Sequence, residues 1–294
     1  MKSIAPLGRV TVPSLRDRKG DSKKISAITA YDYTFARLVD ASGIDLVLVG
    51  DSLSSVIQGN STTLPVTLDE IIYHCKCVAR GLQRALLVGD LPFLSYQPSI
   101  ERAIESSGRL LKEGGVSAVK LEGGIHMAET VRRLVDLDIP VMGHVGLTPQ
   151  SYHRMGGNKV QGRSSGNGSG SRERVLEDAK AIEDAGAFAV VVEGIPGDLA
   201  AEITDALAIP VIGIGAGVEC DGQILVLHDV LGLSAEAKPK FVKNYLNLSE
   251  IVQTALHNYR KEVELAEFPS HEYSYQSTRK TTRVFTLKKT VKKA

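Results

Sequence analysis

The sequence predicts an α/β fold: a single (β/α)8 barrel of the TIM type, followed by a C-terminal helix and a basic tail. Short apolar runs that are typical of buried parallel strands recur along the chain, and segments with a helical pattern separate them. About eight such units fit into roughly 250 residues, the usual size of a closed barrel. A doubly wound open sheet is the alternative, but no glycine-rich dinucleotide fingerprint follows the first strand.

Each expected strand is an apolar run that ends in a polar or ionisable side chain. The clearest is the run from Asp45 to Val49, which continues as Gly50, Asp51 and Ser52. A charge at that point needs water, a cation or several donors, so the strand is expected to stop there. The expected strands span residues 24–30, 45–51, 84–90, 116–122, 140–145, 187–193, 210–214 and 223–228.

The expected helices begin at capping residues and end at glycines. Thr67 and Glu70 form a capping box for the second helix, which Gly81 ends. A loop over 146–171 is longer than a compact domain normally holds, and its second half has the composition of a linker. The expected helices cover residues 34–42, 67–80, 99–113, 127–137, a segment ending at Gly186, 198–208 and 249–264.

The composition favours one catalytic domain. We expect an N-terminal arm over residues 1–23, the barrel over 24–273 and a disordered basic tail over 274–294 that is dispensable for catalysis. The last sixteen residues hold seven basic and no acidic side chains. Without these seven, 28 basic residues face 34 acidic ones, and no basic stripe crosses the body of the chain. This charge pattern argues against nucleic-acid binding.

The location and the cysteine chemistry are expected to be unremarkable. No apolar run approaches the roughly 20 residues that cross a bilayer, and the N-terminus has no secretory apolar region. The three cysteines, Cys75, Cys77 and Cys220, form neither a disulfide framework nor a zinc motif. We therefore expect a cytoplasmic protein with free thiols and no membrane partner.

Ionisable residues at five strand ends predict the functional site. In a barrel the C-terminal ends of all strands meet at one mouth, where acids close together require a cation. Oxygen ligands without cysteine favour Mg²⁺, although each acid alone would serve equally well as a helix cap or salt-bridge partner. The residues expected to converge are Asp51, Asp90, Lys120, Glu122, His144 and Glu193.

Two features of the mouth leave alternatives open. Lys120 shares a strand face with Glu122, and it either compensates the acids, holds a substrate carboxylate or forms a Schiff base. The glycines in 213–217 follow the seventh strand, where many barrels bind phosphate, but they also allow a simple backbone turn.

Eleven short motifs resemble the ketopantoate hydroxymethyltransferase family, in order and over about residues 11–273. Among them are Val49-Gly50-Asp51-Ser52, Asp90-Leu91-Pro92-Phe93 and Val119-Lys120-Leu121-Glu122-Gly123-Gly124. Others are Gly143-His144-Val145-Gly146-Leu147-Thr148-Pro149-Gln150 and Gly213-Ile214-Gly215-Ala216-Gly217. Asn60, Gly194, the Gly/Ser run after Arg163 and the basic tail depart from the family pattern, and none of them is an expected metal ligand.

The resemblance implies transfer of a one-carbon unit from the co-substrate 5,10-methylenetetrahydrofolate to 3-methyl-2-oxobutanoate, which yields 2-dehydropantoate for pantothenate synthesis. It also implies a cytoplasmic homodecamer. Two rival hypotheses are a Mg²⁺-dependent carbon–carbon lyase or mutase acting on oxo acids, and a barrel that is a scaffold without catalysis. By resemblance Glu193 is the general base, the metal ligands are Asp51, Asp90 and Glu122, and the substrate-binding residues are Asp51, Ser52, Asp90, Lys120 and His144.

Overall fold

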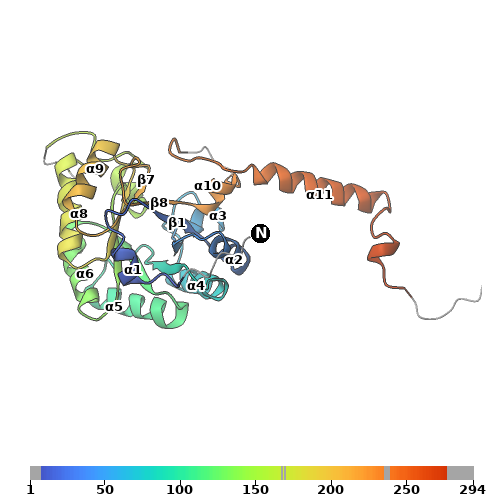
Figure 1. The fold of residues 1–294 in the computed structure, drawn as a ribbon, viewed down its shortest axis with the longest axis horizontal. Helices are drawn as coiled ribbons and strands as arrows, with labels where there is room; N and C mark the ends of the chain where they lie inside the picture. Colours follow the sequence, from blue (N-terminus) through green and yellow to red (C-terminus); the bar gives the residue numbers. More distant parts are fainter. Residues whose placement is uncertain (1–7, 167, 169, 235–238, 277–294) are drawn as a thin grey trace, which may run out of the picture. The chain divides into compact units, whose positions relative to one another are not determined.

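The computed structural model describes residues 8–166, 168, 170–234 and 239–276. Its centre is a closed barrel of eight parallel strands in the order β1 to β8, and β8 pairs with β1 (Figure 1). This confirms the predicted fold class. The strands are β1 Ile25–Thr29, β2 Leu46–Val49, β3 Leu86–Asp90, β4 Ala118–Glu122, β5 Val141–Gly146, β6 Ala189–Glu193, β7 Val211–Ile214 and β8 Gly222–Leu225.

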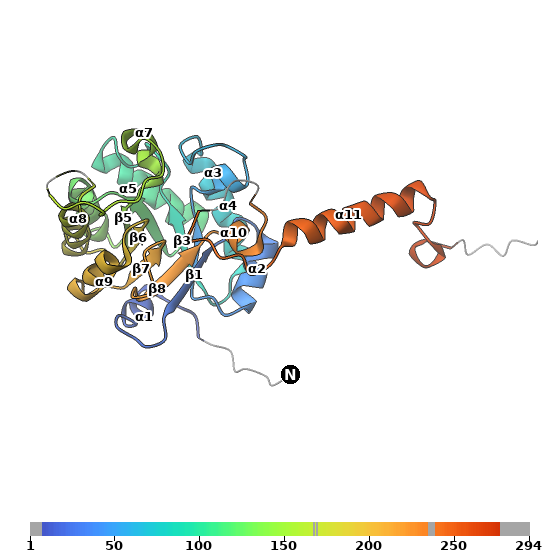
Figure 2. The same cartoon turned by 90° about the horizontal axis from the view of Figure 1, so that it is seen from above.

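Helices surround the barrel (Figures 1 and 2). Thr67 and Glu70 form the predicted capping box of α4, and the loop after β2 contains the short α3. The helices are α1 Val12–Arg16, α2 Tyr33–Ala41, α3 Leu53–Val56, α4 Leu68–Gly81, α5 Ile100–Arg109 (continued by the π-helix Leu110–Gly114), the 3₁₀ turn Ile125–Met127, α6 Ala128–Val135, the 3₁₀ turn Pro149–Ser151, α7 Tyr152–Met155, α8 Arg172–Asp184, α9 Gly197–Ala206, α10 Leu227–Leu231, α11 Leu248–Glu264 and the 3₁₀ turn His271–Tyr273.

The chain divides into two compact units, the barrel unit up to Leu246 and a second unit that begins at Asn247 and includes α11. The domain boundaries expected at residues 23 and 273 stay predictions. Most of the basic tail, residues 277–294, lies outside the described residues. No helix of the described part of the chain is long and apolar enough to span a bilayer.

The end of the barrel differs from expectation at β8. The sequence predicts a strand over 223–228, whereas β8 ends at Leu225 and α10 begins at Leu227, so that His228 is helical. The run around 162–171 is closed by backbone hydrogen bonds, from Gly162 N to Gly170 O at 2.8 Å and from Arg172 N to Ser164 O at 2.9 Å. Ser171 then caps α8.

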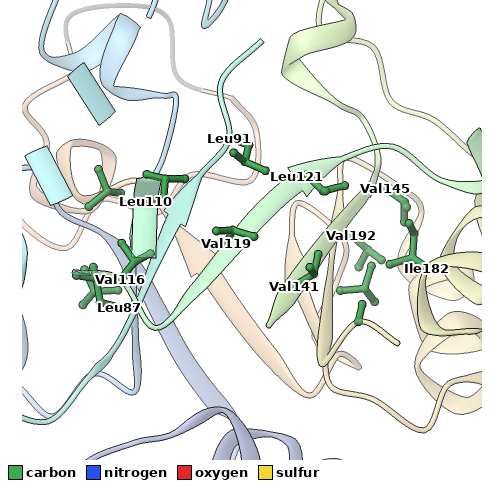
Figure 3. Packing of buried hydrophobic residues seen from close by; sticks show 14 of the residues in the cluster. Leu87, Leu91, Leu110, Val116, Val119, Leu121, Val141, Val145, Ile182 and Val192 are labelled. Atoms are coloured by element: carbon green, nitrogen blue, oxygen red, sulfur yellow. The ribbon is translucent and has the colours of Figure 1, made fainter. Parts of the chain in front are cut away.

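The strands divide the core into two layers, because successive side chains point to opposite faces. One set, including Leu46, Leu48 and Val88, fills the barrel interior. The other set packs between the strands and the helices, and Figure 3 shows Val119, Leu121 and others of this layer. An unbroken apolar strand is therefore buried on both faces, as in other parallel sheets.

The N-terminal arm closes the bottom of the barrel. Figure 2 shows α1 at one end of the barrel and α3 and α7 at the other. Leu15 of α1 is fully buried in the interior cluster. Arg18 pairs with Asp45 at 3.0 Å, and Lys19 pairs with Asp221 at 2.8 Å. The arm is thus part of the barrel core, held by two buried acids at the face opposite the predicted site.

Asp45 predicts a pH dependence of stability. Burial opposes its ionisation, but hydrogen bonds from Ser26, Arg84 and Arg18 outweigh burial and lower its pKa to about 2. Because the pKa is depressed in the folded state, Asp45 contributes stability above pH ~4 and loses that contribution as the pH falls toward 2.

We expect Asp45→Asn to lower the free energy of unfolding by about 2 kcal/mol at pH 7, measured by urea unfolding. The difference from wild type should shrink between pH 4 and 2. The control is Asp69→Asn, which removes an exposed acid paired with Arg109 and should cost less than about 1 kcal/mol. A difference that stays constant at acid pH would contradict the assignment.

Candidate active site at the barrel mouth

The inward rows of side chains change from apolar to ionisable at the C-terminal ends of the strands. On β3 the inward Leu86 and Val88 are followed by Asp90, and on β6 Val191 is followed by Glu193. The site is the direct continuation of the barrel core, since the same alternation that buries the apolar side chains aims these groups at the mouth.

All seven residues selected from the sequence line one cavity of about 660 Å³. The strand register sets Asp90 beside Lys120 and Glu122 beside His144. The predicted convergence is therefore present, although the roles of these residues remain predictions. The seven are Asp51, Ser52, Asp90, Lys120, Glu122, His144 and Glu193.

Lys120 is the buried cation of the acid cluster. Its Nζ lies 2.8 Å from Oδ1 and 2.9 Å from Oδ2 of Asp90, and both side chains are at most 5% exposed. Burial lowers the pKa of Lys120, but the charges of Asp90, Glu122 and Asp51 outweigh burial and raise it above its ordinary value. The ammonium is thus favoured, which argues against a nucleophilic amine and a Schiff base.

Asp51 lies beside this ion pair, just past the end of β2. Its backbone N–H donates to Asp90 Oδ2 at 3.1 Å, and its Oδ2 accepts from Gln150 Nε2 at 2.9 Å. Burial and the charges of Asp90 and Glu122 raise the pKa of Asp51 well above its ordinary value. Burial also raises the pKa of Asp90, and Lys120 opposes that shift. The pocket therefore holds more negative charge than Lys120 alone compensates.

His144 lies between two carboxylates. Its Nδ1 is 3.5 Å from Glu122 Oε1 and its Nε2 is 3.2 Å from Glu193 Oε2. Neither contact has hydrogen-bond alignment, so both are charge contacts. Burial and Lys120 lower the pKa of His144, but the two carboxylates outweigh them and raise it to about 9. At neutral pH the ring is a cation between Glu122 and Glu193.

Ser52 is held by a residue for which the sequence reasoning assigned no role. Its Oγ lies 2.8 Å from the hydroxyl of Tyr31, whose side chain is 1% exposed. Tyr31 lies just after the end of β1, and a residue with a polar group at that place in the sequence could have been recognised as part of the mouth. Gln150 and Tyr96 were also missed, and both belong to loops whose sequence has no periodic pattern.

The glycines after β7 have a packing role. Gly215 has φ +61°, and a Cβ there would lie 2.6 Å from the Phe241 ring. Gly217 has φ +82°, and a Cβ there would lie 2.9 Å from the backbone of Gly197. The positive φ values and the close neighbours support the turn interpretation of this motif.

The donor set fits a magnesium ion that keeps part of its coordination for substrate and water. Among the described residues, no group of three or more His, Cys, Asp or Glu side chains is arranged so that it could hold a metal ion by itself. Lys120 donates hydrogen bonds to Asp90. Asp51 Oδ1 accepts no hydrogen bond from the described residues, and Glu122 Oε1 is buried without a hydrogen bond. Mg²⁺ commonly binds through one or two carboxylates, so this arrangement is compatible with it.

We expect His144 to remain protonated up to a pH of about 9 in the metal-free protein, as followed by NMR of ¹³C,¹⁵N-labelled histidine. Because its pKa is raised on folding, its contribution to stability is complete below pH ~6.5 and is lost as the pH rises through about 9. His126 is the internal control, since burial lowers its pKa. Titration of His144 below pH 6.5 would refute the ion contacts.

Comparison with known proteins identifies relatives of this chain in sequence and in fold. Residues 9–271 match the family of ketopantoate hydroxymethyltransferases. The chain is 55% identical over 267 residues to the 3-methyl-2-oxobutanoate hydroxymethyltransferase of Syntrophotalea carbinolica, which covers 91% of this chain and 98% of that protein. It is 52% identical to the protein of the same name from Pelobacter propionicus, which covers 91% of this chain and 97% of that one.

A solved structure shares the fold at low identity. The phosphoenolpyruvate phosphomutase of Streptomyces platensis subsp. rosaceus superposes with a TM-score of 0.59 at 14% identity, over 87% of this chain and 88% of that one. At that identity the likeness shows the barrel fold alone. The family match and the relatives at more than half identity decide the assignment: the chain belongs to the ketopantoate hydroxymethyltransferase family.

Proposed function

We propose that this chain transfers a hydroxymethyl group to 3-methyl-2-oxobutanoate from 5,10-methylenetetrahydrofolate, giving 2-dehydropantoate. The predicted enzyme class, a hydroxymethyltransferase of pantothenate biosynthesis, is confirmed by the family. The observation that carries the chemistry is the convergence of carboxylates, one lysine and one imidazole in a single cavity.

Asp51 and Asp90 are proposed to hold Mg²⁺, with Glu122 nearby. When bound, the ion acts as a Lewis acid on the carbonyl of the oxo acid, which makes the proton on the adjacent branched carbon easier to remove. Asp51 Oδ1 is available for this role. The ammonium of Lys120 donates to both oxygens of Asp90. Asp90 is therefore proposed to bind the ion while it remains paired with Lys120.

Lys120 and Ser52 are proposed to bind the carboxylate end of the oxo acid. Both line the cavity, and the lysine is charged and nearly fully buried. An ammonium in a pocket without bulk water attracts an anion strongly. It also stabilises negative charge that develops on the substrate oxygen during proton removal.

Glu193 is proposed to remove the proton from the branched carbon. It ends β6, lines the cavity and is the most exposed member of the acid cluster, with a side-chain exposure of 17%. His144 contacts its Oε2 at 3.2 Å and so restricts its orientation. A base that is fixed on one side and open to the cavity on the other matches this step.

The rest of the cavity supports a second, larger substrate. A five-carbon oxo acid occupies only part of a cavity of about 660 Å³. The lining also contains the apolar residues Ile57, Val226, Leu233 and Phe241, and Ile57 and Phe241 are 44% and 38% exposed. We infer that this apolar wall accepts the flat pteridine of the folate, since ligand pockets combine apolar walls with a few polar groups.

The two rival hypotheses make different demands. A lyase or mutase acting on oxo acids would need no folate, so turnover without tetrahydrofolate would favour it. A barrel that is only a scaffold would not need a buried lysine among three acids, an arrangement that is costly unless it is used. A homodecamer and a cytoplasmic location accompany the proposal as further expectations.

We expect Asp51→Asn and Asp90→Asn each to weaken Mg²⁺ binding and to abolish turnover while the barrel remains folded. Calorimetric titration with Mg²⁺ and far-ultraviolet circular dichroism measure the two effects. Asp69→Asn, at an exposed acid of α4, is the control for removing a charge. If both site variants bind Mg²⁺ like wild type, the ligand assignment is wrong.

We expect Glu193→Gln to bind Mg²⁺ and oxo acid but to lose proton exchange at the branched carbon by roughly 10²- to 10⁴-fold, the usual contribution of a positioned base. Exchange in heavy water is followed by NMR without folate, and product formation is measured separately with folate. Glu202→Gln, at an exposed acid of α9, is the matched control. Exchange that persists while product formation stops would transfer Glu193 to the folate step.

We expect Phe241→Ala to raise the KM for the folate by about tenfold, because an apolar contact worth about 1.5 kcal/mol is lost. Proton exchange of the oxo acid without folate should be unchanged, since Phe241 is not one of the residues proposed to bind the oxo acid or the metal. Ile57→Ala should act in the same direction. An equal loss in the exchange assay would show that the wall belongs to the oxo acid site.

A further inference from the structure

Gln150 lies beside the acids of the mouth and forms hydrogen bonds with two of them. It lies in the 3₁₀ turn Pro149–Ser151 after β5 and is 6% exposed. Its Nε2 donates to Asp51 Oδ2 at 2.9 Å and to the carbonyl of Leu91 at 3.0 Å. Its own backbone N–H donates to Glu122 Oε2 at 3.0 Å. One residue therefore holds one oxygen of each of two carboxylates.

The orientation of the Gln150 amide is fixed by its neighbours. The Leu91 carbonyl only accepts hydrogen bonds, so the NH₂ end must face Leu91 and Asp51. Oε1 lies 2.9 Å from the Tyr96 hydroxyl and 2.9 Å from Gln97 Nε2. Both amide protons and the carbonyl oxygen are thus engaged. A carboxylate at this position lacks the two donors, and an apolar side chain lacks all four contacts.

Tyr96 extends this network to the backbone of β4. Its hydroxyl lies 2.9 Å from the carbonyl oxygen of Glu122 and accepts from the Glu122 N–H at 3.1 Å. Glu122 is therefore held at its backbone by Tyr96 and at Oε2 by Gln150. What remains without a hydrogen bond on the two acids is Asp51 Oδ1 and Glu122 Oε1.

We propose that Gln150 is a positioning residue for the magnesium site, and this inference rests on the proposed function. It occupies one oxygen of Asp51 and one of Glu122, which leaves Asp51 Oδ1 without a hydrogen bond and Glu122 Oε1 facing His144 Nδ1 at 3.5 Å. Without it, Asp51 is free to rotate and like-charge repulsion from Glu122 is no longer opposed by a fixed donor. Groups that orient metal ligands in this way typically change metal affinity by about 10- to 100-fold when replaced.

The test is calorimetric titration of the full chain with Mg²⁺ alone, in the absence of substrates. Gln150→Met keeps the length of the side chain and removes its four hydrogen bonds, including the one to Asp51, while the backbone N–H that binds Glu122 stays in place. It should therefore weaken Mg²⁺ binding by about 10- to 100-fold. The Mg²⁺ concentration for half-maximal proton exchange should rise by the same factor. At saturating Mg²⁺ the exchange rate should return to within a few fold of wild type, because Glu193 is untouched.

The matched control is Gln97→Met. Gln97 donates to Oε1 of Gln150 but has no hydrogen bond to either acid, so Mg²⁺ affinity should stay within about threefold of wild type. Since Gln150→Met leaves buried groups unpaired, thermal unfolding is measured in parallel. If that variant does not fold, Tyr96→Phe, which removes only a hydroxyl, should give a smaller loss of Mg²⁺ affinity that exceeds the effect of Gln97→Met.

The outcomes separate the inference from the function on which it rests. Two outcomes overturn the positioning role alone, provided that the wild-type chain binds Mg²⁺. In the first, the folded Gln150→Met binds Mg²⁺ as tightly as wild type. In the second, Gln97→Met loses as much Mg²⁺ affinity as Gln150→Met. Loss of exchange at saturating Mg²⁺ overturns it too, because the role would then be direct. A wild-type chain that binds no Mg²⁺ refutes the metal site of the proposed function, and the inference falls with it.

Discussion

The ion pair between Lys120 and Asp90 is the interaction on which the mouth of the barrel depends. The carboxylates of Asp51, Asp90 and Glu122 are buried at the mouth, and Lys120 is the cation that contacts one of them at hydrogen-bond distance. Without that charge, burial and mutual repulsion would favour protonated acids. Because four carboxylates, those of Asp51, Asp90, Glu122 and Glu193, face only the cations of Lys120 and His144 among the described lining residues, the pocket keeps an attraction for a further cation, which is the electrostatic basis of the proposed magnesium site.

The two ends of the barrel use buried charge for different purposes. At the bottom, Asp45 and Asp221 are fully paired with Arg18 and Lys19 of the arm and with backbone donors, so these groups stabilise the fold. At the mouth, Glu122 Oε1 and both ring nitrogens of His144 lack aligned partners. Incomplete pairing costs stability and leaves groups free to meet a ligand. This contrast supports placing function at the mouth independently of any relative.

The chemistry that we propose follows from how each group is restrained. Lys120 is fixed as a cation by its acids, Glu193 is held on one side by His144, and Gln150 binds one oxygen each of Asp51 and Glu122. Such preorganised groups require little rearrangement when charge develops on the substrate. Ile57 and Phe241 line the same cavity and are proposed to bind the larger substrate without taking part in proton removal.

The sequence by itself determined the barrel and the seven side chains of the mouth. Apolar runs that end in Asp51, Asp90 or Glu193 carry a local signal, because a charge cannot continue a buried strand. The prediction from sequence was wrong about the end of the barrel, where the apolar run to His228 forms the strand β8 and then the separate helix α10.

Only the tertiary structure decided the role of Gln150, which lies 99 residues from Asp51 and in a loop without periodicity. Likewise, the turn role of Gly215 depends on Phe241, and the burial of Leu15 depends on strands that follow it. These contacts join segments that are distant in the chain, and a local pattern of residues contains no information about which distant partner the closed barrel brings to it.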